Sequence, residues 1–118
     1  MLMEATVTKR VLILSDCLGS SDRELGTLLM KNFLYALARN EQMPVAVMMM
    51  NDGVRLACDG SDALDSLRLL HERGVAIKAC GTCLDYLGLT DSLAVGEIGA
   101  MVGSVEALMG DDSVVTLA

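Results

Sequence analysis

The sequence contains no tryptophan, and only 3% of its 118 residues are aromatic. Because 53% of the residues are hydrophobic, the core must be built from aliphatic side chains and methionine. The length suits one domain with one core, and we expect a single domain over residues 1–118 with a polar lead-in at 1–8. No apolar stretch reaches the ~20 residues that a membrane-spanning helix needs.

Runs of lysine or arginine are also missing, and the net charge is −7. A nucleic acid or an anionic membrane surface is therefore not an expected partner. The first ten residues contain no apolar segment of the kind found in a signal peptide, so we expect a cytoplasmic protein. In that compartment, paired cysteines are more often catalytic or metal-binding than disulfide-bonded.

Apolar runs alternate with segments of helical periodicity along most of the chain. This alternation predicts βαβ units, and thus an α/β fold with helices on both faces of a five-stranded parallel sheet. The predicted strands are Arg10–Leu14, Val45–Met50, Val75–Ala79, Leu93–Val95 and Ser113–Leu117. The predicted helices are Arg23–Arg39, about Ser61 to Gly74, and Ala100–Met109, and Val54–Cys58 is expected to be a short extended piece.

The helix predicted over Arg23–Arg39 is apolar around most of its circumference. A helix that lies on a sheet needs only one apolar stripe. A helix that is apolar on two sides is covered from two sides, and in a chain this short another subunit would provide the second cover.

The loops that follow the strands of a parallel sheet meet at one edge, where ligands bind. Three of these loops contain all four cysteines of the chain, namely Cys17, Cys58, Cys80 and Cys83. His71 is expected at the opposite edge and is a poor candidate for a base that acts on a thiol.

The segment Cys80-Gly81-Thr82-Cys83 follows a predicted strand and opens a predicted short helix. A thiol at such a junction faces unpaired backbone N–H groups, which favour the reactive thiolate. Two buried inert thiols are an alternative, because free cysteine is often buried. A zinc or iron–sulfur site built from four cysteines is another alternative. Structural zinc sites usually contain a second close pair of ligands, however, and Cys17 and Cys58 are isolated in the sequence. A thioredoxin-like site is disfavoured because the only proline, Pro44, precedes the pair.

Two further features of the predicted edge are open to more than one interpretation. The Ser15–Asp22 loop could hold a phosphate as in flavodoxin-like proteins, but aromatic rings for a flavin are scarce. Glu97, between Gly96 and Gly99, could be a site carboxylate, an interface contact or a solvated loop residue. We assign no metal ligands and no cofactor.

Several blocks of the sequence together resemble a known family. They are Ser15-Asp16-x-Leu18-Gly19-Ser20, Glu24-Leu25-Gly26, Leu29 to Tyr35, Asn51-Asp52-Gly53-Val54, Cys58-x-Gly60-Ser61, Cys80 to Asp85, and Ala94-Val95-Gly96-Glu97. The chain resembles the DsrE-like domain of YedF-type selenium-metabolism proteins, which belong to the DsrE/DsrF/DsrH sulfur-relay family. The resemblance extends from about Val7 to Leu117.

This resemblance implies a three-layer α/β/α domain that assembles as a homotrimer or hexamer. In the family, a cysteine just after a mid-chain strand carries a persulfide, and the matching position here is Cys80. Cys83 and Cys58 match the YedF-type pattern. Cys80 and Cys83 are thus the candidate catalytic residues, and Cys58, Gly81, Thr82, Asn51 and Glu97 are candidate binding residues.

The implied activity is that of a sulfurtransferase that relays sulfur or selenium and needs no cofactor. YedF-type proteins carry a TusA-like domain with a Cys-Pro motif, which has no counterpart here, so a TusA-like carrier on a separate chain is the implied partner. The alternatives are a non-catalytic binding subunit of such a system, or a small-ligand or metal-binding α/β module. Because Cys83 lies inside the helix start, we expect it to be more shielded than Cys80.

Overall fold

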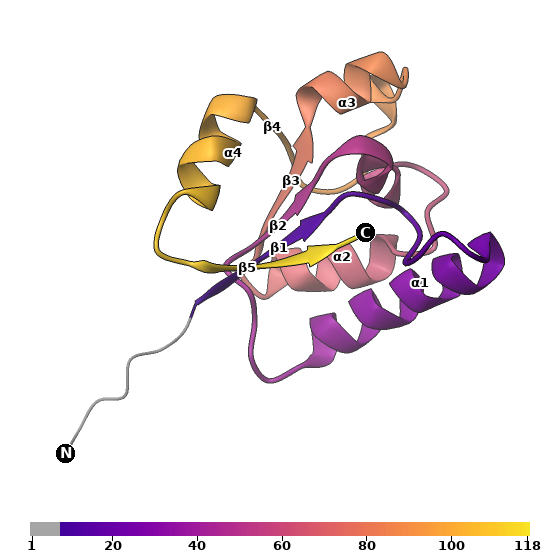
Figure 1. Cartoon of the computed structure of the whole chain (residues 1–118), viewed down its shortest axis with the longest axis horizontal. Coiled ribbons are helices and arrows are strands. Elements are labelled where there is room, and N and C mark those ends of the chain that lie inside the picture. The colour runs from indigo at the N-terminus through magenta and orange to yellow at the C-terminus, as the bar shows by residue number, and fades with distance from the viewer. Residues whose placement is uncertain (1–7) are drawn as a thin grey trace.

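The computed structural model describes residues 8–118. Within this range the chain forms one mixed α/β unit, shown in Figure 1. Its strands are β1 (Lys9–Ile13), β2 (Ala46–Met49), β3 (Ala76–Cys80), β4 (Glu97–Gly99) and β5 (Ser113–Leu117). Its α-helices are α1 (Arg23–Arg39), α2 (Leu64–Glu72), α3 (Gly81–Tyr86) and α4 (Met101–Leu108), and two 3-10 helices are η1 (Asn51–Ala57) and η2 (Thr90–Ser92).

The five strands form a single sheet in the order β4-β3-β2-β1-β5, and all neighbouring pairs are parallel. This arrangement confirms the predicted fold class. The carboxyl ends of the strands therefore lie at one edge of the sheet, and the loops that leave them meet there.

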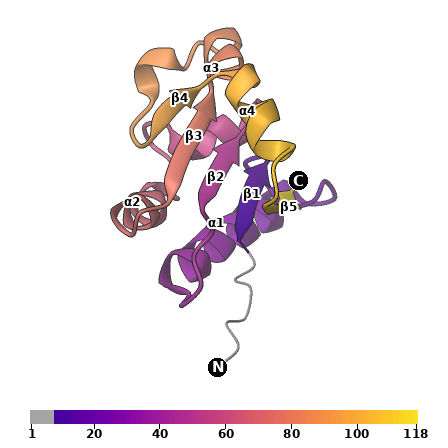
Figure 2. The same cartoon turned by 90° about the vertical axis from the view of Figure 1, so that its left-hand side faces the viewer.

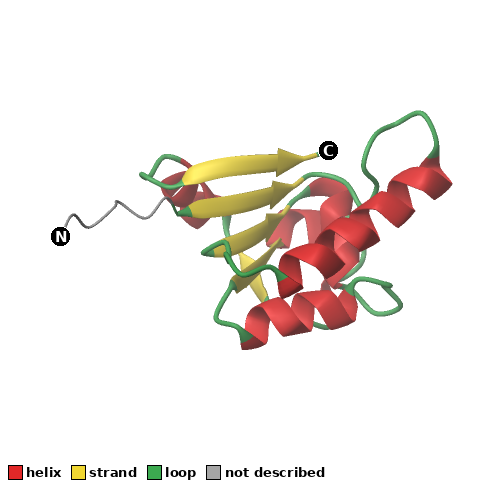
Figure 3. Cartoon of the chain, turned by 90° about the horizontal axis from the view of Figure 1, so that it is seen from below, coloured by secondary structure: helices red, strands yellow, loops and turns green. Residues whose placement is uncertain are grey.

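Helices α1 and α2 pack against each other under one face of the sheet, and α4 lies on the other side (Figures 1 and 2). Figure 3, seen from below, shows α1 and α2 next to each other on the same side of the sheet. Alternate strand residues point to opposite faces. The core lies on the face of α1 and α2, where Ile13, Met49 and Ile77 meet Leu34 and Leu67.

Helix α1 has the bounds that its sequence predicts. The Asp22 carboxylate accepts a hydrogen bond from the Leu25 N–H at 3.0 Å and caps the first turn. Residues at a spacing of four form its buried stripe, namely Gly26, Met30, Leu34 and Ala38. Leu25, Leu28 and Leu29 on the outer side are about half exposed, at 52%, 52% and 45%. The second apolar side that the sequence predicts is thus present on the surface of the chain.

The segment after β2 differs from the prediction. Of the expected extended piece Val54–Cys58, only Cys58 is extended, because Asn51–Ala57 winds into the 3-10 helix η1. Gly53 lets η1 approach β1 closely, since a Cβ on Gly53 would lie 2.4 Å from the carbonyl oxygen of Ile13.

The position of the fourth strand also differs from the prediction. Leu93–Val95 is not a sheet strand, and Leu93 forms only an antiparallel bridge with Cys58. Gly96 then turns the chain with a φ of 82°, a conformation that favours glycine, and Glu97–Gly99 pairs with Lys78–Cys80 instead. The strand expected over the apolar run therefore begins two residues after it.

The second helix starts later than predicted. Ser61 does not cap α2, because its hydroxyl oxygen accepts a hydrogen bond from the Ala63 N–H in a preceding turn, and the helix begins at Leu64. Gly74, with a φ of 91°, ends the segment as expected. In residues 8–118, no helix combines the length and apolar character needed to cross a membrane.

Candidate functional site: a thiol pair at the end of β3

Cys80 is the last residue of β3, and Cys83 lies in the first turn of α3. The strand places the pair at the carboxyl edge of the sheet, as the sequence predicts. The two thiols are close enough to share a hydrogen bond. The end of β3 and the start of α3 thus bring two neighbouring thiols together.

The exposure of the two thiols is the reverse of our expectation. Cys80 is buried, with 8% of its surface exposed, and Cys83 is partly exposed. The prediction that Cys83 is the more shielded residue is wrong. The reason is tertiary packing, because β4 lies alongside the end of β3 and pairs Gly99 with Cys80.

A backbone N–H group from η1 points at the more exposed sulfur. The Asn51 N–H donates a hydrogen bond to Cys83 Sγ, with 3.1 Å between nitrogen and sulfur. Asn51 has a φ of 52°, an uncommon conformation for a residue other than glycine, although asparagine tolerates it better than most. The structure therefore brings Asn51 to the thiol pair, where it contacts Cys83 through its backbone.

Burial raises the pKa of the Cys83 thiol, and the shared hydrogen bond with Cys80 raises it further. The Asn51 N–H opposes this shift, because a hydrogen bond to sulfur favours the thiolate. The net direction is upward, so the thiolate is the minor form near neutral pH. The reactivity of Cys83 then increases with pH over the range in which the thiolate forms.

We expect variants at Asn51 to separate the backbone contact from the side chain. Asn51→Gly accepts a positive φ and keeps the N–H, so the rate of Cys83 alkylation should stay within about twofold of wild type. Asn51→Val disfavours that φ and displaces the N–H. Losing one hydrogen bond to a charged sulfur, worth about 1.5 kcal/mol, should raise the pKa of Cys83 by about one unit and slow alkylation about tenfold below that pKa.

The measurement is the rate of iodoacetamide modification against pH, with the modified cysteine located by mass spectrometry. A valine variant whose profile overlays that of wild type would show that the Asn51 N–H does not act on Cys83.

Gly81 and Thr82 connect the two cysteines. A Cβ on Gly81 would lie 2.9 Å from Cγ2 of Ile98, so the absence of a side chain lets β4 pack against the start of α3. Thr82 is exposed and lies beside Cys83. Both predicted binding residues therefore lie at the thiol pair, and Gly81 has a clear packing role.

Cys58 and Cys17 occupy interior positions. Cys58 is 3% exposed, its thiol donates to the Val54 carbonyl oxygen at 3.3 Å, and burial raises its pKa. Cys17 is 5% exposed, and its thiol lies 3.5 Å from the Arg23 carbonyl oxygen. Inert structural thiols have these properties. Within residues 8–118, no three His, Cys, Asp or Glu side chains are placed to share a metal ion, so the four cysteines do not converge.

Glu97 does not lie at the thiol pair. The prediction that it lies in a loop is also wrong. It is the first residue of β4, opposite Lys78, and its carboxylate accepts a hydrogen bond from the Lys78 ammonium group. That contact lowers the pKa of Glu97. Glu97 and His71 line a common hollow beside the first half of β3, so His71 lies away from the thiols, as the sequence predicts.

Tyr86 is a feature of the site that the sequence reasoning missed. It lies three residues after Cys83, on the same side of α3, and 89% of its surface is exposed. The spacing of three residues could have drawn attention to it. Its exposure depends on how α3 sits on the sheet.

The fold and the site define a parallel α/β domain that presents a pair of neighbouring thiols at the carboxyl edge of its sheet. The family model described as the DsrE/DsrF-like family matches residues 19–117. The chain therefore belongs to the DsrE/DsrF-like family, which is linked to sulfur relay. A search of curated proteins found no match.

Three solved structures are similar to the chain in fold. The ychN protein from E. coli has a TM-score of 0.68 and 23% identity, covering 93% of this chain and 100% of that one. Protein MTH1491 from Methanobacterium thermoautotrophicum has a TM-score of 0.64 and 21% identity, with 92% and 98% coverage. Protein BT1422 from Bacteroides thetaiotaomicron has a TM-score of 0.62 and 11% identity, with 92% and 94% coverage. These similarities show a shared fold.

Proposed function

We propose that the chain is a sulfur-relay protein that holds sulfane sulfur on the Cys80–Cys83 pair. The observation that carries this proposal is the contact between a partly exposed thiol, Cys83, and a buried one, Cys80, at the carboxyl edge of the sheet. The family's link to sulfur relay supports it, as does the resemblance of Cys80 to the persulfide-bearing position of DsrE relatives.

The chemistry is thiolate attack on a persulfide. The Cys83 thiolate attacks the terminal sulfur of a donor R–S–SH, the donor S–S bond breaks, and its electron pair leaves on R–S⁻, which takes up a proton. Cys83 then carries –S–SH. The Cys80 thiolate can attack the same terminal sulfur and take it over, which returns Cys83 to its thiolate. No net oxidation or reduction occurs. The transfer therefore needs only the thiols of Cys80 and Cys83 and the donor persulfide.

The buried position of Cys80 suits storage. A persulfide on a residue that is 8% exposed meets fewer solvent thiols than one on the surface. Delivery reverses these two steps. The Cys83 thiolate attacks the terminal sulfur of the Cys80 persulfide, and an acceptor thiolate then attacks the same sulfur on Cys83 and carries it away. If Cys80 instead attacks the inner sulfur of Cys83, the products are a Cys80–Cys83 disulfide and hydrosulfide.

Intact-mass spectrometry after incubation with cysteine persulfide tests the proposal. Wild type should gain the mass of one sulfur atom, on the peptide that contains both cysteines. The Cys80→Ser/Cys83→Ser double variant should gain nothing. If wild type and the double variant give the same spectrum, the chain is not a sulfur carrier, and a non-catalytic binding role replaces this one.

We propose a TusA-like carrier protein on a separate chain as the partner of the pair. The exposed ring of Tyr86 beside Cys83 offers an aromatic contact of the kind enriched in protein interfaces. The proposal also places the protein in the reducing cytoplasm, in keeping with four free cysteines.

We further propose that the chain forms a homotrimer or a dimer of trimers through the outer side of α1. Leu25, Leu28 and Leu29 would otherwise leave an apolar surface in water. Light scattering at micromolar concentration should give a mass above that of a monomer. Leu28→Glu should shift it to the monomer, because association would bury the carboxylate, whereas Leu28→Met should not. A monomeric wild type would contradict this assembly.

A further inference from the structure

The chain turns sharply between β2 and η1, directly beside the thiol pair. Met50 is still extended, and η1 begins at the next residue, Asn51, which has a φ of 52°. A residue other than glycine keeps a positive φ only where its surroundings impose it. Residues in such conformations are frequent in segments that switch between two states.

Two hydrogen bonds hold this turn. One lies within it, because the Gly53 N–H donates to the Met50 carbonyl oxygen at 2.9 Å. The other leaves it, because the Asn51 N–H donates to Cys83 Sγ at 3.1 Å. Only the second bond depends on the chemical state of a thiol. The conformation of Asn51 is therefore coupled to the state of Cys83.

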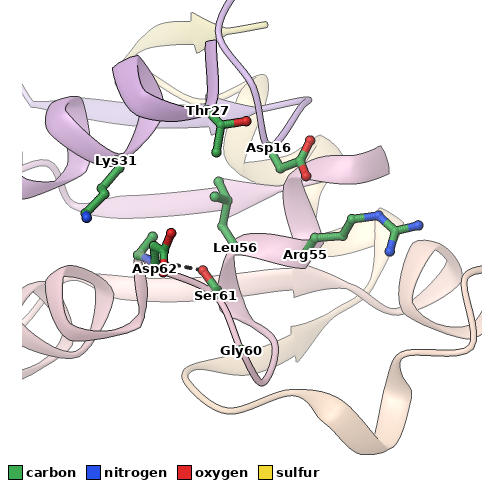
Figure 4. A pocket seen from close by; sticks show the side chains of 9 residues that line it. Asp16, Thr27, Lys31, Arg55, Leu56, Gly60, Ser61 and Asp62 are labelled. Carbon is green, nitrogen blue, oxygen red and sulfur yellow. Dashed lines mark hydrogen bonds between the residues drawn. The ribbon is translucent and has the colours of Figure 1, made fainter. Parts of the chain in front are cut away.

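The second half of η1 is held independently of the thiols. Val54 and Leu56 are buried in the core. Figure 4 shows Leu56 between Thr27 of α1 and Ser61 in the turn that precedes α2. A change at Cys83 thus affects the first residues of η1 and leaves its second half in place.

A disulfide between Cys80 and Cys83 would change the acceptor of the bond from Asn51. The two sulfurs lie at hydrogen-bonding distance, and an S–S bond of about 2.05 Å requires them to close by more than about 1 Å. Cys80 is buried at the end of a strand that pairs with β4, so the sulfur that moves is that of Cys83, in the six-residue helix α3. The Asn51 N–H then faces a displaced sulfur that can no longer become a thiolate.

We propose that the turn at Asn51 is a redox switch, in which oxidation of Cys80 and Cys83 to a disulfide releases the first residues of η1. In the dithiol form, the contact with Cys83 Sγ holds the positive φ. In the disulfide form, Asn51 relaxes to a negative φ. Because Asn51 is exposed, a protein that docks over Cys83 meets a different surface in the two forms. The switch uses two thiols and one backbone group, so it does not require the chain to carry sulfane sulfur.

The oxidant is a small-molecule disulfide, R–S–S–R. The Cys83 thiolate attacks one of its sulfurs, the S–S bond breaks, and R–S⁻ leaves. The Cys80 thiolate then attacks Cys83 Sγ, and the second R–S⁻ leaves. The two R–S⁻ groups take up the two protons that the cysteines have lost. The cysteine pair is oxidised by two electrons, and the small-molecule disulfide is reduced to two thiols.

Amide hydrogen exchange, followed by NMR on the full chain, tests the switch. The dithiol form is compared with protein oxidised by glutathione disulfide, in which mass spectrometry confirms the disulfide of the pair. Exchange of the Asn51 N–H should accelerate at least about tenfold, because it loses its bond to sulfur. Exchange of the Gly53 N–H should also accelerate, because the turn opens more often. The Val45 N–H, bonded to the Lys9 carbonyl oxygen at the other end of β2, is the control and should keep its rate.

Variants of Asn51 test the same coupling in reverse. Because the contact exists only in the dithiol form, weakening it favours the disulfide. Asn51→Val disfavours the positive φ, so it should shift the equilibrium with glutathione toward the disulfide at least about threefold. This shift lowers the reduction potential of the pair by about 14 mV or more. Asn51→Gly is the matched control, because it keeps the N–H and accepts the positive φ, and it should give no shift toward the disulfide.

Three results would overturn the proposal. Glutathione disulfide could leave the pair as a dithiol, oxidation could leave the exchange of the Asn51 N–H unchanged, or Asn51→Val and Asn51→Gly could give the same equilibrium constant. Glutathione disulfide contains no sulfane sulfur. Each of these results would therefore contradict the switch and leave the sulfur-relay function to its own test.

Discussion

Cys83→Ser should slow the loading of sulfur from cysteine persulfide by at least about a hundredfold, because serine has a hydroxyl group in place of the nucleophilic thiol. The remaining thiol of the pair, Cys80, is 8% exposed and meets the donor poorly. Cys80→Ser should load at a rate within about twofold of wild type. Its persulfide, held on the partly exposed Cys83, should be lost to added thiol faster than that of wild type.

Cys17→Ser is the matched control, because Cys17 is buried and lies away from the pair. It should load and retain sulfur as wild type does. The opposite ranking, with loading abolished in Cys80→Ser and intact in Cys83→Ser, would assign the first attack to Cys80. The exposure of the sulfurs in the structure would then not determine the order of transfer.

Gly96→Ala should destabilise the fold by about 2–4 kcal/mol, because it combines two costs. The φ of 82° is unfavourable for any L side chain, and the new Cβ would lie 2.5 Å from the Ile77 carbonyl oxygen. In a domain of this length the midpoint of thermal unfolding should fall by about 10 °C or more. Because Gly96 sets the start of β4, which covers Cys80, the alkylation of Cys80 should also accelerate.

Gly103→Ala is the control for this prediction. Gly103 lies in α4, and a Cβ there would meet nothing within 4 Å. Alanine should therefore stabilise the helix by about 0.5–1 kcal/mol. Circular dichroism against temperature measures both variants, and a Gly96→Ala protein as stable as wild type would show that the turn at Gly96 is not the constraint described.

The elements that the sequence predicts well have strong local signals. Helix α1 combines an Asp22 cap with apolar positions at helical spacing, and β5 is an uninterrupted run of strand formers. The fourth strand has no such signal. Its three residues, Glu97–Gly99, form a strand only because they pair with β3. The apolar run Leu93–Val95 is the stronger local pattern, but Leu93 and Val95 pack against the core without joining the sheet.

The candidate site also has a part that local sequence signals predict and a part that depends on contacts between distant residues. The spacing of Cys80 and Cys83 after an apolar run locates the pair from sequence alone. Which sulfur faces outward depends on β4 beside Cys80 and on the η1 backbone beside Cys83. These contacts join residues up to 32 positions apart, and no local pattern reports them.

The most direct measurement of the relay follows isotopically labelled sulfane sulfur through the protein to a TusA-like carrier. Wild type is loaded from labelled cysteine persulfide, freed of donor and mixed with the reduced carrier, and both proteins are analysed by mass spectrometry. We predict that the label leaves the Cys80–Cys83 peptide and appears as a persulfide on the carrier's cysteine, with no transfer from the double serine variant. If the label stays on the chain or is released only as hydrosulfide, the chain does not relay sulfur.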